Sequence, residues 1–134
     1  MLRYLFDTNT VSFLIKERQP YLALRIEKVG IERIAISAIT EAELLWGLAK
    51  KPQAPIIEQR IKLFLEQVEV LSWDRDAAKS YAQLKQKMQQ QGFNLSPQDL
   101  LIAVHAYAFD ITLITNDQAF FKLQPLLDVE DWTV

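Results

Sequence analysis

The chain has 134 residues, half of them apolar, with a formal charge of −2, no cysteine and one histidine. This length suits a single domain spanning residues 1–134, which buries enough surface to fold without a metal or a disulfide. The lack of cysteine excludes thiol catalysis, zinc–thiolate sites, iron–sulfur clusters and disulfides, and one histidine excludes any site that needs two imidazoles.

Apolar runs and turn residues predict strands that alternate with helices along the chain. Strands are expected at residues 3–6, 34–37, 68–72 and 112–115, with an edge strand within 129–134. Helices are expected at residues 10–16, 20–29, 40–50, 55–67, 74–91, 97–109 and 116–121. This alternation predicts an α/β fold with three layers, α/β/α, around a central, mainly parallel sheet.

The N-terminal residues lack the pattern of a signal peptide, and no apolar run approaches the length of a membrane span. We therefore expect a cytoplasmic protein that makes no membrane contact. The absence of cysteine agrees with a reducing compartment.

Four acidic residues lie at one edge of the expected sheet. Asp7 directly follows the first strand, and Asp117 lies two residues beyond the fourth. Glu43 and Asp99 lie in the first turns of helices that start at the same edge, where sites gather in parallel sheets. Converging carboxylates favour a hard divalent cation, Mg²⁺ or Mn²⁺, which activates water for attack on phosphorus. The arrangement therefore points to metal-dependent hydrolysis of a phosphodiester bond.

Each of these acids also has an ordinary structural explanation. Thr40 and Glu43 have the spacing of a helix capping box. Asp99 suits a helix N-terminus because of the helix dipole, and Asp7 and Asp117 are typical turn residues. These explanations apply to each acid separately, but they do not require all four to converge.

Several other residues admit two interpretations. Glu41 competes with Glu43, but residues two apart on a helix point in different directions, so at most one enters the cleft. His105, within an apolar helix, is expected to be a core histidine. Packing rather than base stacking is expected for the tryptophans, Trp46, Trp73 and Trp132.

Charge is unevenly distributed along the chain. Residues 1–92 carry a net charge of +3, and residues 93–134 carry −5. A basic region of this kind could meet a polyanion, or it could simply be a set of solvated helix faces. The lysines for which both interpretations stand are Lys50, Lys51, Lys79, Lys85 and Lys87.

Four stretches of the sequence resemble the VapC toxins of the PIN-domain ribonucleases: YLFDTNTVSFLIK, ISAITEAELLWGLAKK, DLLIAVHAYAFDITLITNDQAFFKL and LLDVEDW. The resemblance runs from about residue 3 to residue 133, and the closing EDW is frequent in the branch that acts on initiator tRNA. It implies a Mg²⁺- or Mn²⁺-dependent endoribonuclease toxin of a VapBC-type toxin–antitoxin system, acting on structured RNA such as the anticodon stem-loop of initiator tRNA. It also implies a homodimer, or a larger hetero-oligomer, with a VapB-type antitoxin.

The resemblance assigns roles residue by residue. The acidic residues of the family correspond to Asp7, Glu43, Asp99 and Asp117. Asp7 and Asp99 match the principal metal ligands, and Asn9 and Thr115 match supporting positions. A shift of one residue would put Asn116 in the fourth acidic position, so that assignment stays open.

Two other functions are compatible with the sequence. A receiver-like signalling domain with a phosphoacceptor aspartate shares the size, the alternating elements and the acids. Such domains usually have an acidic pair after the first strand, where Asp7 stands alone. A catalytically silent PIN fold acting as a binding module is disfavoured because all four acidic positions are filled.

Overall fold

Five short strands form one parallel sheet with β1 at its centre, in a computed structural model that describes residues 1–50, 52 and 55–134. The strands are β1 (Tyr4–Phe6), β2 (Ile34–Ser37), β3 (Glu69–Leu71), β4 (Thr112–Ile114) and β5 (Val129–Glu130). Their order across the sheet is β3-β2-β1-β4-β5, and every neighbouring pair is parallel. The carboxyl ends of β1 and β4 are therefore adjacent, as the predicted site requires.

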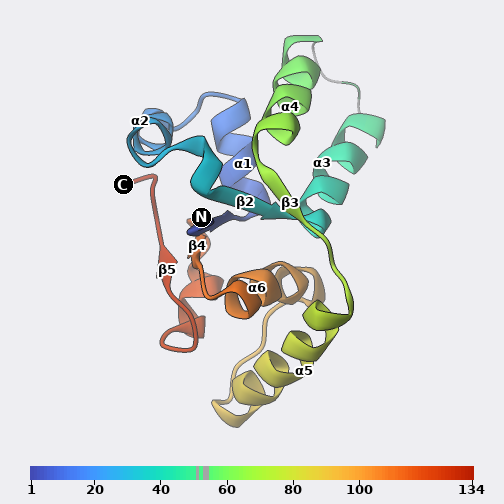
Figure 1. The fold of residues 1–134 in the computed structure, drawn as a ribbon, viewed down its shortest axis with the longest axis vertical. Helices are drawn as coiled ribbons and strands as arrows, with labels where there is room; N and C mark the ends of the chain where they lie inside the picture. Colours follow the sequence, from blue (N-terminus) through green and yellow to red (C-terminus); the bar gives the residue numbers. More distant parts are fainter. Residues whose placement is uncertain (51, 53–54) are drawn as a thin grey trace.

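Helices cover both faces of this sheet. They are α1 (Thr8–Ile15), α2 (Pro20–Val29), the 3₁₀ helix η1 (Ile31–Arg33), α3 (Ala38–Lys50), α4 (Pro55–Gln67), α5 (Arg75–Gln90), α6 (Pro97–Phe109) and the 3₁₀ helix η2 (Gln118–Leu123). Helices α1 to α4 lie on one side of the sheet, and α5 and α6 lie on the other (Figure 1). Each side has its own apolar core cluster. The three-layer α/β/α architecture expected from the sequence is confirmed.

Two helices begin earlier than the sequence pattern predicted, and both differences have a local cause. Helix α1 begins at Thr8 because the Asp7 carboxylate accepts a hydrogen bond from the Thr10 backbone N–H. Helix α3 begins at Ala38, where the Ser37 hydroxyl accepts one from the backbone N–H of Ile39. Residue 40 therefore lies inside α3, so the capping-box interpretation of the spacing between residues 40 and 43 is wrong.

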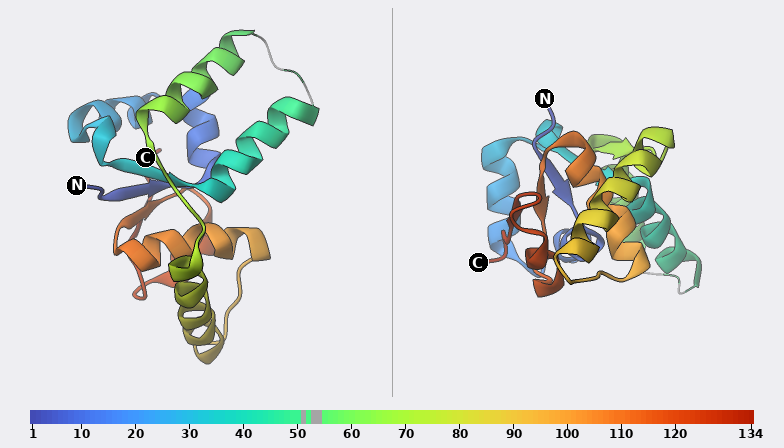
Figure 2. Two further views of the ribbon diagram at one scale, coloured as in Figure 1. Left: turned by 45° about the vertical axis from the view of Figure 1, so that its right-hand side comes forward. Right: turned by 90° about the horizontal axis from the view of Figure 1, so that it is seen from below.

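The C-terminal segment packs against one face of the sheet after a very short strand. Strand β5 ends at Glu130, because Trp132 turns inward, where it is only 1% exposed and packs edge-on against Tyr4 and Phe6. The Trp132 Nε1–H donates a 2.9 Å hydrogen bond to Glu130. The N- and C-termini lie on the same side of the molecule (Figure 2).

The structure confirms the expectations for the histidine and for one of the other two tryptophans. His105 is fully buried, as expected, with Nε2 3.1 Å from the carbonyl oxygen of Ser72, and its burial lowers the pKa of the imidazole. Trp73 packs and donates a hydrogen bond to a backbone carbonyl of α6. Trp46 is 62% exposed, so it does not have the packing role expected for it within the chain.

Across residues 1–50, 52 and 55–134, no helix combines the length and the apolar character needed to cross a lipid bilayer.

Candidate active site

All four predicted acids line one small cavity of about 100 Å³. Its wall comprises Asp7, Thr8, Asn9, Glu43, Asp99, Ile102, Asp117 and Phe120. Two of these acids follow neighbouring strands, and Asp99 projects from the first turn of α6. Glu43 was expected in the first turn of its helix but lies in the second turn of α3, because that helix begins at Ala38. Segments more than 100 residues apart in sequence thus bring their carboxylates to one edge of the sheet.

Asp7 is the most deeply buried of the four acids, at 3% exposed. One carboxylate oxygen accepts a 2.8 Å hydrogen bond from the Thr10 backbone N–H, and the other accepts a 2.5 Å bond from the Thr115 hydroxyl. Burial raises the pKa of Asp7; the two hydrogen bonds oppose this shift, and the nearby Asp117 charge adds to it. A buried carboxylate of this kind is stabilised by a cation.

Thr115 connects two of the acids. Its hydroxyl donates to Asp7 and accepts a 3.0 Å hydrogen bond from the Asp117 backbone N–H. The Asp117 carboxylate in turn accepts a bond from the Ala119 N–H and caps η2. Asp117, rather than Asn116, is the residue of this pair that lines the cavity.

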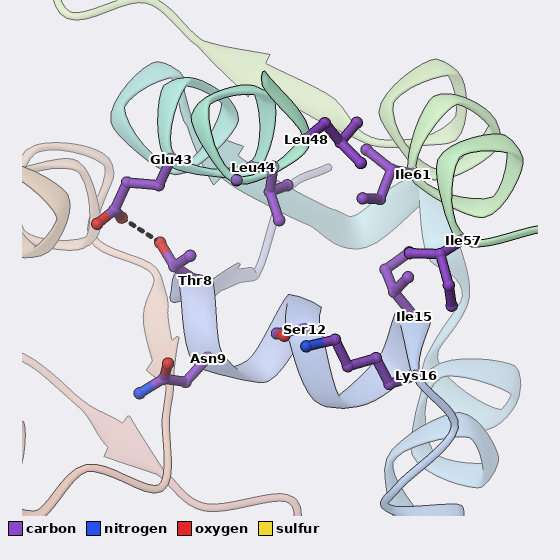
Figure 3. A pocket seen from close by; sticks show the side chains of 11 residues that line it. Thr8, Asn9, Ser12, Ile15, Lys16, Glu43, Leu44, Leu48, Ile57 and Ile61 are labelled. Atoms are coloured by element: carbon purple, nitrogen blue, oxygen red, sulfur yellow. Dashed lines mark hydrogen bonds between the residues drawn. The ribbon is translucent and has the colours of Figure 1, made fainter. Parts of the chain in front are cut away.

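Glu43 is held from across the cavity by Thr8, the residue after Asp7. The Thr8 hydroxyl donates a hydrogen bond to Glu43 Oε1 (Figure 3). It also lies 3.2 Å from the Thr40 hydroxyl. Glu43 lines the cavity, whereas Glu41 does not. Thr8 was not among the site residues predicted from the sequence. Its position beside Asp7 was visible, but its contact with a residue 35 positions away was not.

Asp99 lies in the first turn of α6, where its backbone N–H donates a 3.3 Å hydrogen bond to the capping Ser96 hydroxyl. Its half-buried carboxylate faces the cavity. Asn9 is exposed at the rim, on the first turn of α1. The structural roles of Asp7, Asp99 and Asp117 as caps or first-turn residues are therefore compatible with a shared site.

The donor chemistry of the cavity fits a divalent cation. Its described wall includes four carboxylates and no lysine or arginine, and oxygen ligands are those that Mg²⁺ and Mn²⁺ prefer. Within the described residues, no three acidic or histidine side chains are gathered closely enough to ligate one ion as they stand. Lining a common cavity is a weaker condition than ligation, so the carboxylates would have to move inward to share an ion.

A second, apolar groove of about 180 Å³ adjoins the cavity. It shares Thr8, Asn9 and Glu43 with the cavity and runs between α1, α3 and α4 (Figure 3). Aliphatic side chains form its floor, namely Ile15, Leu44, Leu48, Ile57 and Ile61.

The sequence matches the PIN domain family over residues 4–124. It is 33% identical to the tRNA(fMet)-specific endonuclease VapC of Salmonella typhimurium, over 98% of this chain and 99% of the relative. It is 32% identical to Ribonuclease VapC2 of Rickettsia felis, over 96% of this chain and 97% of the relative. The chain therefore belongs to the PIN-domain family.

Solved structures of VapBC complexes also contain chains that are similar to this one. The structure of VapBC2 from Rickettsia felis bound to a promoter DNA fragment includes a chain that matches with a TM-score of 0.85 at 29% identity, over 98% of this chain and 99% of that one. DNA-bound VapBC from Salmonella typhimurium matches with a TM-score of 0.82 at 31% identity, over the same shares. Within the PIN-domain family, the chain is a VapC-type ribonuclease. The receiver-like alternative has no support from these comparisons.

Proposed function

We propose that this chain is a divalent-metal-dependent endoribonuclease toxin whose active site is the cavity lined by Asp7, Glu43, Asp99 and Asp117. The observation that carries the proposal is the meeting of four carboxylates from four separate segments, with no lysine or arginine in the described wall. We further propose that residues 1–134 are one domain, since a single sheet serves both helical layers.

Asp7 and Asp99 are the proposed principal metal ligands, with Mg²⁺ the first candidate and Mn²⁺ the second. A bound ion would lower the pKa of a ligated water and offset negative charge on the phosphoryl oxygens. Glu43 and Asp117 would orient the attacking water or ligate a second ion. Asn9 lies at the rim, and Thr115 holds Asp7 and Asp117 in register.

The chemistry is tested by sequencing the RNA ends that the purified chain produces with Mg²⁺. In-line attack by water is expected to leave a 3′-hydroxyl and a 5′-phosphate. Cleavage in excess EDTA, or a 2′,3′-cyclic phosphate product, would contradict the proposal. The Asp7→Asn variant controls for contaminating nucleases, and equal cleavage by both proteins would place the site elsewhere.

The proposed substrate is initiator tRNA, cut in the anticodon stem-loop, which places the activity in the cytoplasm. Support comes from the relative in Salmonella typhimurium, whose name states specificity for tRNA(fMet). Incubation with total RNA, followed by mapping of all new 5′ ends, should give one dominant cut in this tRNA. A dominant cut in another RNA would overturn the choice of substrate and leave the chemistry intact.

We propose that a VapB-type antitoxin covers the apolar groove and directs a basic side chain toward the acidic cavity. Solved VapBC complexes from Rickettsia felis and Salmonella typhimurium support such a partner. The groove's aliphatic floor, continuous with the cavity, suits an apolar segment whose charged group complements the carboxylates.

The groove is tested with Leu48→Glu, which places a charge on its floor. Inhibition by a VapB-type antitoxin that inhibits the unsubstituted chain is expected to weaken at least tenfold, while cleavage by the free variant continues. Leu24→Glu, at an exposed position on α2, is the matched control. Unchanged inhibition of a folded Leu48→Glu variant would exclude the groove.

We also propose a homodimer formed through α3. Leu45 and Trp46 are 50% and 62% exposed on this helix, and exposed apolar side chains of this size favour an interface. Light scattering should give twice the monomer mass for the chain, and Trp46→Glu should give the monomer.

A further inference from the structure

Helix α5 differs in charge from the rest of the chain. It contains four basic residues and one acid, a net charge of +3, whereas the whole chain carries −2 and the remainder therefore −5. Residues 77–98 contain three lysines and six glutamines but no acid. This stretch ends directly before Asp99, which lines the acidic cavity.

Two lysines on this helix are held against tyrosine side chains. Lys85 Nζ lies 3.2 Å from the Tyr81 hydroxyl and 5.4 Å from the centre of its ring. Lys87 Nζ donates a 2.7 Å hydrogen bond to the Tyr107 hydroxyl and lies 5.0 Å from that ring centre. Each neutral hydroxyl accepts a hydrogen bond from only one of the three N–H groups of the ammonium. The positive charge of the lysine and its other two N–H groups remain available to bind a partner.

Neither lysine is used in an ion pair. Among the residues that the structure describes, the ion pairs are Arg25–Glu130 and Arg60–Glu17, and neither involves α5. Both lysines are exposed. The contacts with tyrosine restrict the side chains before any partner arrives, which lowers the entropy cost of binding.

The Lys87–Tyr107 pair lies within reach of the acidic cavity. Tyr107 is on α6, eight residues after Asp99, which corresponds to about 12 Å along the helix at the usual rise. Helix α5 packs on α6 and projects at one end of the molecule, at the bottom of Figure 1 and of the left view in Figure 2. A chain of phosphates could therefore contact α5 while one phosphodiester bond enters the cavity.

We infer that α5 is a docking surface for the RNA backbone, with Lys85 and Lys87 as its main phosphate contacts. This inference rests on the proposed ribonuclease function and adds the surface that holds the substrate outside the cavity. Lysines and glutamines dominate the exposed face of α5, whereas protein interfaces are anchored by apolar and aromatic side chains. Phosphate contacts of this kind supply affinity and orientation rather than sequence recognition.

The experiment measures binding of an initiator tRNA transcript, at several salt concentrations, to the chain carrying Asp7→Asn so that the RNA stays intact. Adding Lys85→Gln and Lys87→Gln is expected to reduce the slope of log K against log salt by about 1.4 to 1.8, the value for two lost phosphate contacts. Affinity near physiological salt should fall roughly 10- to 50-fold. The matched control removes two exposed lysines from the opposite layer, Lys28→Gln and Lys62→Gln.

Cleavage by the chain with its native Asp7 separates this inference from the proposed function. With Lys85→Gln and Lys87→Gln, KM for the full tRNA should rise while kcat stays near the unsubstituted value. If the unsubstituted chain cleaves RNA but the double variant matches the control in slope and KM, α5 is not the docking surface. If the unsubstituted chain neither binds nor cleaves RNA, the proposed function itself fails.

Discussion

Asp7 and Asp117 follow strands and are fixed by the backbone and by Thr115, whereas Glu43 and Asp99 project from helices into the same cavity. Both oxygens of Asp7 accept hydrogen bonds, and Asp117 accepts one from a backbone N–H. Glu43 is held by the Thr8 hydroxyl, and within the described chain the Asp99 carboxylate accepts no hydrogen bond.

The difference shows how one site combines a fixed half with an adjustable half. Sheet geometry places the strand-end carboxylates, and deep burial raises the pKa of Asp7. Of the carboxylates on the helices, Glu43 is held by one side-chain hydroxyl and Asp99 by no hydrogen bond within the described chain, so these two are the ones expected to move inward when a cation binds. Substitutions in the fixed half should therefore have the larger effects.

The largest effect is expected for Asp7→Asn. This change keeps the shape of the side chain but removes the charge that would hold the cation. Loss of several kcal/mol of metal-dependent stabilisation corresponds to at least about a thousandfold decrease in kcat. Single-turnover cleavage of initiator tRNA measures it. A decrease of less than tenfold would show that Asp7 is not a ligand.

The next effect is expected for Thr115→Val, which removes the hydroxyl shared by Asp7 and Asp117. Groups that orient metal ligands typically contribute 10- to 100-fold, and one that contacts two acids should lie near the upper value, about 100-fold. Thr115→Ser keeps the hydroxyl and should restore most of the cleavage rate. Equal losses in the Val and Ser variants would contradict the positioning role.

A smaller effect, about tenfold, is expected for Thr8→Val in the adjustable half. Thr8 holds one oxygen of Glu43, and a cation could reorganise this side chain without the threonine. The loss should appear as weaker Mn²⁺ binding in calorimetry with little change in melting temperature, and Thr8→Ser should bind as the unsubstituted chain does. A loss larger than that of Thr115→Val would reverse the proposed order of the two halves.

The smallest effect concerns stability and pH. Burial raises the pKa of Asp7 in the folded state above its ordinary value of 3.8. Between pH 3.8 and this raised pKa, the folded state therefore holds more protons than the unfolded state. The free energy of unfolding therefore falls as pH rises through this window and stays lower above it. In EDTA, Asp7→Asn should raise the melting temperature at neutral pH and leave it nearly unchanged below pH 3.8. A lower melting temperature at neutral pH would show that the cap matters more than the buried charge.

Local signals predicted most of the elements in the chain. Pro20, Pro55 and Pro97 each mark the first residue of a helix, and Asp74 and Ser96 act as the expected caps. The alternation of strands and helices also predicted at which edge of the sheet the acids meet. These features depend on neighbouring residues, so the sequence carries them directly.

Contacts between distant residues could not be predicted in the same way. The hydrogen bond between Thr8 and Glu43, and the exposure of Trp46, depend on how α1 and α3 pack, which no local pattern records. Helix α3 begins two residues before the predicted start because Ser37, the last residue of β2, also accepts a hydrogen bond from the Ile39 backbone N–H.

The double role of Asp7 affects which substitutions are expected at this position as such proteins diverge. Its carboxylate both caps α1 and lines the cavity. Replacement by alanine would remove the cap, which typically costs about 1 kcal/mol, whereas asparagine keeps an oxygen for the Thr10 N–H. A descendant that abandoned cleavage but kept its fold is therefore expected to carry asparagine at this position more often than alanine. Asparagine following the first strand would then mark, from sequence alone, a copy retained for binding rather than for cutting RNA.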